Sequence, residues 1–441
     1  MLLSIIIAFL LSLIMLTIVI ANYSWFIKHS NLYGHILLFF MGWKVLAYYL
    51  ATPMLDFLGD FKYWKLYKIA HFEYVFLYII ELVSMFIFLL TVRIILQSKK
   101  KYKQVKIQEN LLIKLVLLVT IYTNCLSFLE SFSFGLISNQ FEFFKSLSGF
   151  FGQPLTLVLL YNYRKMDRFL KGLIIVSLFT SFLMMNSRGF IIYSILTLLS
   201  FFLYYNNWKL KPKHVSYLLI SSFLYIVFIG SFPQLSLNVD KSDTSSRGSV
   251  SFIGYDNASK TSGRTLFEEV DFRFGMMPRM SSKFVHLYFN GESAGINPIL
   301  NSAVGILPRS IWPNKPHPST SDGNDIYSQG MYKIYSESVY GPSTNMVEFS
   351  SGGHMFWELG IIGVLFFPII SAIFICFVMN FFSAKTNYIG IAMLISSFKP
   401  WGFMEPKIWL SDIPIQIYQV WLPLLTLYIA ARFIGFFKIL K

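Results

Sequence analysis

The chain has 441 residues, of which 55% are hydrophobic, 18% aromatic and only 13% charged. No soluble domain needs that much apolar surface, so most of the chain is predicted to lie in lipid. The formal net charge of +15 is spread over short loops, which argues against a nucleic-acid-binding stripe and is typical of cytoplasmic loops. Both cysteines, Cys125 and Cys376, lie inside apolar runs, which argues against a disulfide framework or a metal site.

Apolar runs of about 20 residues predict about eleven membrane-spanning helices, within a range of about ten to twelve. The first run lacks a basic n-region and a small-residue cleavage site, so it is predicted to remain as a helix rather than be removed as a signal peptide. The expected fold class is an all-α, polytopic integral membrane protein. The predicted helices cover residues 3–21, 35–54, 73–96, 111–129, 146–162, 169–186, 189–206, 215–232, 355–381, 386–403 and 411–431.

The basic loops set the predicted orientation, because cytoplasmic loops of membrane proteins carry an excess of lysine and arginine. This bias puts the C-terminus in the cytoplasm, and an odd number of helices then puts the N-terminus outside. The basic residues of these loops are Lys99, Lys100, Lys101, Lys103, Lys106, Arg164, Lys165, Arg168, Lys171, Lys209, Lys211, Lys213, Arg432, Lys438 and Lys441.

The same topology divides the chain into helices in 1–232, a large outer loop in 233–353, and further helices in 354–441. The loop holds ten Lys/Arg against eleven Asp/Glu, as expected for a long translocated segment that is indifferent to charge. Its proline-broken apolar stretch "INPILNSAVGILPRSIWPNKPHP" predicts a re-entrant or interface-lying segment. A short amphipathic helix on the bilayer surface is predicted by five apolar residues at helical spacing, Leu266, Phe267, Val270, Phe274 and Met277.

Arg188 is the one charge in the 37 residues from Gly172 to Trp208, in a turn at the outer end of the sixth predicted helix. It is either a helix-end side chain that reaches the interface or an anion contact, because a guanidinium binds phosphate bidentately and stays charged. Arginines of the outer loop can each have a structural role, for example in pairs with Glu268 and Glu269. Together with Arg188 they favour a polyanionic ligand: Arg247, Arg264, Arg273, Arg279 and Arg309.

His354 and Glu358 are four residues apart at the start of the ninth predicted helix, so they share one helix face. Such a pair can take a proton from an attacking hydroxyl, or it can simply form a polar helix entrance. Carboxylates of the preceding loop are alternative bases: Asp322, Asp325 and Glu348.

Lys44 and Glu81 fall within the second and third predicted helices. Both are expected near mid-membrane, where they would form a structural ion pair; a proton or ion relay is the alternative. No Walker, HExxH, CxxC or GxSxG motif is present, so the sequence does not support an ATPase, a zinc protease, a redox enzyme or a serine hydrolase.

The helix number, the Ser-Arg-Gly turn and the late outer loop resemble those of the Wzy-type O-antigen (oligosaccharide repeat-unit) polymerases. Within the loop, "ILPRSIWPNKP" at 306–316 resembles an "IPxxxWPxxP"-like stretch of enterobacterial common antigen polymerases. The following "GPSTNMVEFSSGGHMFWELGIIGVLF" looks like that family's lead-in to its next helix. The motif resemblance extends from about 184 to 370, and the remainder of the likeness is in hydropathy.

The resemblance implies a GT-C-like glycosyltransferase of the bacterial inner membrane that needs no metal or cofactor. Such an enzyme transfers a growing glycan from undecaprenyl diphosphate to a lipid-linked repeat unit at the periplasmic face. Its partners would be lipid-linked oligosaccharide and membrane lipids, a chain-length regulator and a flippase, with no nucleic acid. The catalytic candidates are then Arg188, His354 and Glu358, and the candidate ligands of diphosphate and glycan are Arg264, Arg273, Arg279, Arg309 and Trp312.

Two other functions stay open. An O-antigen ligase shares the chemistry, and its helix motif is matched by Gly360 and Gly363, although His354 lies closer to these glycines than the ligase pattern expects. A lipid-linked oligosaccharide flippase or other transporter would show repeats and charges along several helices, whereas here the unusual charges gather at one face.

Topology mapping tests the orientation on which this interpretation depends. Reporters fused at residue 188 and within 233–353 are expected to lie on the outer face. A cytosolic location of these positions would contradict the polymerase hypothesis, because arginines there could not reach a donor presented at the outer surface.

Overall fold

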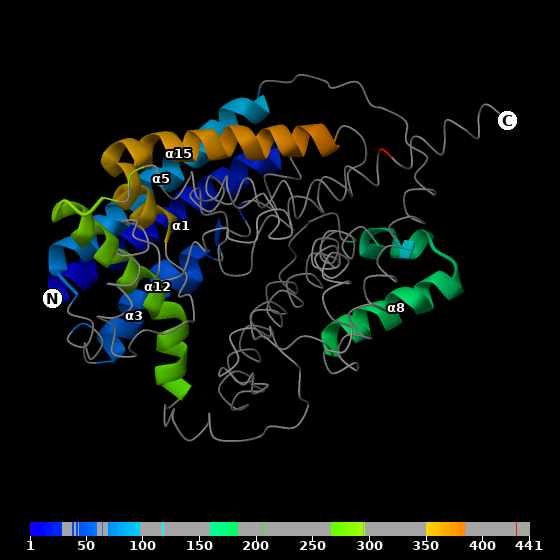
Figure 1. The fold of residues 1–441 in the computed structure, drawn as a ribbon, viewed down its shortest axis with the longest axis horizontal. Coiled ribbons are helices and arrows are strands. Elements are labelled where there is room, and N and C mark those ends of the chain that lie inside the picture. Colours follow the sequence, from blue (N-terminus) through cyan, green and yellow to red (C-terminus); the bar gives the residue numbers. More distant parts are fainter. Residues whose placement is uncertain are drawn as a thin grey trace, which may run out of the picture. The chain divides into compact units, whose positions relative to one another are not determined.

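A computed structural model describes residues 1–28, 38, 41–42, 44–59, 64, 69–97, 117–118, 159–183, 205, 266–293, 295, 350–383 and 429. Every regular element among these residues is a helix, as predicted (Figure 1). Contacts divide the chain into two compact units. The first comprises residues 1–101, 268–380 and 401–416, and the second comprises 102–267, 381–400 and 417–441.

The first unit contains three long, predominantly apolar helices: α1 (Leu2–Lys28), α5 (His71–Gln97) and α15 (Ser351–Ser383). Each contains a stretch long and apolar enough to cross a membrane, namely Leu2–Trp25, His71–Gln97 and Gly352–Phe374. They confirm the helices predicted at 3–21, 73–96 and 355–381.

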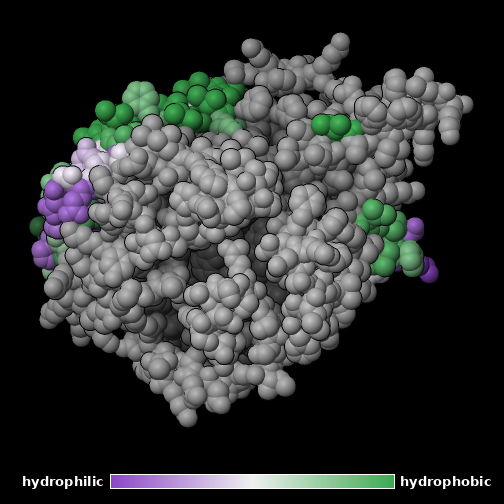
Figure 2. All heavy atoms as spheres, viewed as in Figure 1, coloured by the Kyte–Doolittle hydropathy of each residue, from purple (hydrophilic) through white to green (hydrophobic). Residues whose placement is uncertain are grey.

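Each long helix buries one face and leaves another, equally apolar, exposed. On α5 the exposed large side chains recur about every four or seven residues, at Phe72, Ile79, Phe86, Leu90 and Ile94. On α15 a similar stripe covers the upper left of Figure 2, and its exposed residues are Ile361, Ile362, Leu365, Phe366, Ile370 and Ile373. Long exposed apolar stripes are expected on the lipid-facing side of a membrane helix, because hydrocarbon solvates apolar side chains and offers no polar partner.

A π-helix, Val45–Leu50, leads directly into α3 (Ala51–Leu58), where the sequence predicts the end of a helix at 54. The wider π turn frees a backbone carbonyl from the regular hydrogen-bond pattern. The carbonyl of Tyr49 accepts hydrogen bonds from the hydroxyls of Ser12 on α1 (2.8 Å) and Tyr78 on α5 (3.3 Å). The irregular turn thus holds α1 and α5 against the segment that carries α3.

Helix α12 (Leu266–Phe289) confirms a helix in the loop, but it is longer than predicted and its second half is not on a surface. Buried apolar side chains follow Pro278 within the bundle, and Val285 shares a cluster with Leu77 of α5 and Phe356 of α15. The pattern that predicted a surface-lying helix ends at Met277, and α12 continues beyond it. Four further core positions lie beyond it, at Met280, Phe284, Val285 and Leu287.

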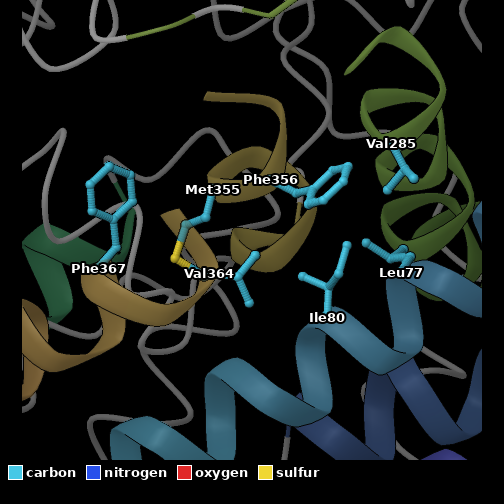
Figure 3. Close-up of a cluster of buried hydrophobic side chains, with 7 residues drawn as sticks. All are labelled: Leu77, Ile80, Val285, Met355, Phe356, Val364 and Phe367. Atoms are coloured by element: carbon cyan, nitrogen blue, oxygen red, sulfur yellow. The ribbon is translucent and has the colours of Figure 1, made fainter. Parts of the chain in front are cut away.

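Helix α15 is broken eight residues after its start. Leu359 (φ −130°, ψ 19°) and Gly360 (φ 60°, ψ −142°) leave the helical region, and the chain then resumes as a helix. Figure 3 shows the result: Phe356 on the first part and Val364 on the second belong to one buried cluster with Leu77 and Ile80 of α5, and Met355 lies beside Val364. The break therefore lets two short helical faces close over the same core.

The second unit contains a 3-10 turn at Tyr163–Lys165 and α8 (Arg168–Leu183), which confirms the helix predicted at 169–186. Asp167 caps α8, because its Oδ1 accepts the amide of Leu170 at 2.8 Å. The helices predicted at 111–129, 146–162, 189–206, 215–232, 386–403 and 411–431 lie wholly or mostly outside the described residues. The number of about eleven spanning helices stays a prediction.

Gly360→Ala is expected to destabilise the protein by at least about 2 kcal/mol, because its backbone region is nearly restricted to glycine. A Cβ there would also clash with the hydroxyl and ring of Tyr288. Gly172→Ala on α8 is the matched control: nothing lies within 4 Å of its Cβ, and a helical Gly→Ala change is neutral or stabilising. Thermal unfolding of both variants in detergent measures the difference. Equal melting temperatures would contradict the assigned break.

Candidate functional site

A fully buried ion pair joins α3 to the loop helix α12. Arg279 donates from Nε (2.8 Å) and Nη2 (2.7 Å) to Oδ1 of Asp56, and both side chains are 0% exposed. The hydroxyl of Tyr74 on α5 donates to the other carboxylate oxygen at 3.0 Å. Two charges are removed from water here, so the pair is tolerable only because each carboxylate oxygen has a donor.

The tyrosines extend this pair into a buried polar chain. The hydroxyls of Tyr74 and Tyr78 are 3.2 Å apart, and Tyr78 also reaches the Tyr49 carbonyl of the π turn. Polar groups in an apolar bundle must bind one another, so the chain fixes the register of α3, α5 and α12 at one end of α5.

Glu81, one turn further along α5, binds the start of α15. Its Oε1 accepts the amide of Gly352 at 2.7 Å, and a Cβ on this glycine would lie 2.6 Å from the same oxygen. A carboxylate at a helix N-terminus is stabilised by the free amides and the helix dipole. The predicted Lys44–Glu81 ion pair was therefore wrong. The Glu81 carboxylate binds the N-terminal end of α15, while the Lys44 ammonium lies 5.5 Å from the centre of the Tyr49 ring.

Serines complete the junction between α12 and α15. The Oγ of Ser281 accepts the amide of Ser350 (2.7 Å), and the Oγ of Ser350 accepts the amide of Gly353 (3.3 Å), as an N-cap residue does. A Cβ on Gly353 would lie 2.9 Å from the carbonyl oxygen of Ser281. The pair of glycines thus permits a close approach that larger residues would prevent.

His354 and Glu358 follow on this first part of α15, and both are buried, with exposures of 4% and 1%. The imidazole ring packs against Phe284 of α12 and Trp357, with ring centroids 4.3 and 5.8 Å away. Glu358 is the last helical residue before the break. Its carbonyl and that of Trp357 accept the hydroxyl of Ser293, at 2.8 and 3.0 Å. Ser293 thereby satisfies carbonyls that the broken helix leaves without an amide.

Three of the sequence-predicted site residues lie buried in this first unit, namely Arg279, His354 and Glu358. Arg279 binds Asp56 and faces the protein interior, whereas the sequence suggests a ligand contact. Arg273 lies on α12, but its side chain is outside the described part of the chain. The remaining candidates lie outside the described residues altogether: Arg188, Arg264, Arg309 and Trp312.

Asp56 and Ser293 are the members of the site that the sequence reasoning missed. Asp56 had a visible signal, because it and Lys44 are the charged residues of the otherwise apolar stretch 35–59. Ser293 had none, because a serine after a helix is ordinary until the broken helix that it caps is known.

The described chain is all-helical, and its three long apolar helices place it in the class of α-helical membrane proteins. More narrowly, the protein belongs to a family described as a domain of unknown function, DUF8712, which matches residues 4–379. No curated protein and no solved structure matches the chain. The site itself offers a buried carboxyl and an imidazole on one helical segment of α15, and a buried guanidinium–carboxylate pair between α12 and α3.

A double-mutant cycle tests the buried pair. Arg279→Met and Asp56→Leu are each expected to cost about 3–5 kcal/mol, because each leaves an uncompensated buried charge, and the double variant to cost less than their sum. The control is Glu73→Gln, whose carboxylate binds the exposed His286 at 3.1 Å and should cost about 1 kcal/mol or less. Unfolding in detergent gives the energies. Additive losses at Asp56 and Arg279 would contradict their coupling.

Proposed function

We propose that this protein is a polysaccharide polymerase of the bacterial inner membrane with a GT-C-like arrangement of about eleven spanning helices. It would transfer a growing glycan from undecaprenyl diphosphate to a lipid-linked oligosaccharide repeat unit at the periplasmic face. The products would serve an O-antigen or a related surface polysaccharide.

One observation carries the proposal: two carboxylates in the first half of α5 contact helix α12 and the start of α15. Glu81 contacts Gly352 near the start of α15, and Glu73 in the first turn of α5 contacts His286 near the end of α12. Both contacts lie in the His71 half of α5, away from the basic loop that follows Gln97. The positive-inside bias would turn that half outward, where a flipped lipid-linked donor is presented.

The reaction proposed for the site is the direct transfer of a glycosyl group from the lipid diphosphate to an acceptor hydroxyl. Glu358 or His354 takes the proton of the acceptor hydroxyl, whose oxygen forms a new bond to the anomeric carbon of the donor sugar. The bond from that carbon to the diphosphate oxygen breaks, and undecaprenyl diphosphate leaves with the electron pair. Arg188 and arginines of the outer loop stabilise the added negative charge.

In this scheme Arg279 positions the loop helix rather than the diphosphate. Its guanidinium is buried on Asp56, so moving it to a ligand would leave a buried carboxylate uncompensated, at a cost of about 3–5 kcal/mol. Arg188, Arg264, Arg273 and Arg309 stay the proposed anion contacts, and Trp312 the proposed sugar contact.

A lipid-linked oligosaccharide flippase is the second candidate, because one observation favours it. Discontinuous membrane helices with a charged residue at the break are found at the substrate and ion sites of transporters. Helix α15 has such a break, next to the buried Glu358.

Deletion of the gene separates the candidates by gel analysis of the surface glycan. Loss of the polymerase is expected to leave lipid A-core carrying a single repeat unit. Core without any repeat, with full-length chain still on the lipid carrier, would indicate a ligase instead. Single units trapped on the cytoplasmic side would indicate a flippase.

Point variants in the complemented strain test the roles. Arg188→Ala and Glu358→Gln are expected to abolish the glycan ladder while the protein accumulates in the membrane, and Arg188→Lys is expected to be impaired because a lysine cannot bind phosphate bidentately. Arg93→Gln and Glu73→Gln are the matched controls and should keep the ladder. A normal ladder in Arg188→Ala would remove Arg188 from the mechanism, and one in Glu358→Gln would leave His354 as the base.

A further inference from the structure

A group of cations lies at the start of α8 in the second unit. Arg164 and Arg168 are exposed, and Lys171 is partly exposed one turn later. These three residues, here called the basic turn, sit on the 3-10 turn and the first turn of the helix. Lysine and arginine are common in such loops, so the question is whether their side chains are ordered and available.

Tyrosine rings contact two of the three cations of the basic turn. The guanidinium of Arg164 lies 4.2 Å from the centre of the Tyr205 ring, and the Tyr205 hydroxyl accepts the Arg164 amide at 3.2 Å. The same hydroxyl lies 3.0 Å from the carbonyl of Tyr161, to which it donates. The ammonium of Lys171 lies 5.6 Å from the centre of the Tyr163 ring. Cation–π contacts restrict side chains that would otherwise be mobile while leaving their hydrogen-bond donors open.

No carboxylate neutralises the basic turn within the part of the chain that the structure describes. Its neighbour Asp167 is engaged as the cap of α8 through Oδ1, at 2.8 Å from the Leu170 amide. Three cations thus occur within two successive turns of the chain without a described carboxylate between them, and such a concentration of like charge favours an anionic partner.

Exposed apolar side chains adjoin the cations. Phe169, between Arg168 and Lys171, is 74% exposed, and Ile175 further along α8 is 54% exposed. An aromatic ring beside basic residues, at the end of an apolar helix, matches the boundary between headgroups and hydrocarbon. A free anion in water would need the cations but would leave Phe169 without a partner.

We propose that the basic turn is a binding site for the phosphate headgroup of an anionic phospholipid. The guanidinium groups of Arg164 and Arg168 hold the phosphate, Lys171 adds a third cation, and Phe169 lies along the upper acyl chain. This site is independent of the proposed glycosyl transfer, and the predicted orientation places it in the cytoplasmic leaflet, where anionic lipids meet positive loops.

Lipid titration of the purified full-length protein, followed by native mass spectrometry, tests the site. The probes are phosphatidylglycerol and phosphatidylcholine with identical acyl chains. Wild-type protein should retain phosphatidylglycerol preferentially, and affinity should fall about fivefold for each basic residue removed, or about a hundredfold in R164Q/R168Q/K171Q. Arg93→Gln is the control, because its guanidinium also lies over an aromatic ring, 4.6 Å from the centre of Trp25, but outside the basic turn.

Further arms distinguish the other outcomes. If the triple variant does not accumulate, Arg168→Gln alone should lower the affinity for phosphatidylglycerol about fivefold. Phe169→Ala should weaken the binding of the lipid without changing the competition by inorganic phosphate. An unchanged preference in Arg168→Gln, or equal losses in Arg93→Gln, would overturn the proposal. Displacement of the lipid by millimolar inorganic phosphate would assign the site to a free anion instead.

Discussion

The buried ion pair between Asp56 and Arg279 is the constraint on which the described first unit depends. Its two partners are separated by more than two hundred residues, and they belong to the short apolar helix α3 and to α12, in the segment predicted to be a large loop. In a low-dielectric bundle, neither charge is tolerable without the other. The pair therefore makes α12 an integral part of the bundle. Around it, the Tyr74 hydroxyl of α5 binds the second oxygen of Asp56, and the Glu81 carboxylate binds an amide at the start of α15.

The arrangement of α12 explains how α15 is able to break. A membrane helix that stops and restarts leaves backbone groups without partners, which is severe in hydrocarbon. Here Ser293, just beyond α12, binds the carbonyls of Trp357 and Glu358, and the indole of Trp357 donates to the carbonyl of Glu292. A loop segment that follows one helix thus supplies what another helix has lost, and Glu358 stays beside the interruption.

Much of the helical architecture was predictable, because long apolar runs leave few alternatives; α1, α5, α8 and α15 begin and end within a few residues of their predicted bounds, apart from the longer C-terminal end of α1. Pairings within the site were not predictable from spacing. Lys44 and Glu81 were predicted to pair only because their charges are opposite and both were expected near mid-membrane, yet the amide of Gly352 competes for the same carboxylate. Similarly, Asp56 stood out by its charge, but no local pattern identifies Arg279 as its partner. Such contacts depend on how distant helices pack.

The π turn at Val45–Leu50 has a geometric consequence for the ion pair. One residue more per turn rotates everything downstream by about 100° about the helix axis. If the same residues formed a continuous α-helix, the Asp56 carboxylate would project from a different side of the helix, away from Tyr74 and toward the hydrocarbon. The wider turn six residues upstream takes up that extra residue and thereby aims the acid at its guanidinium.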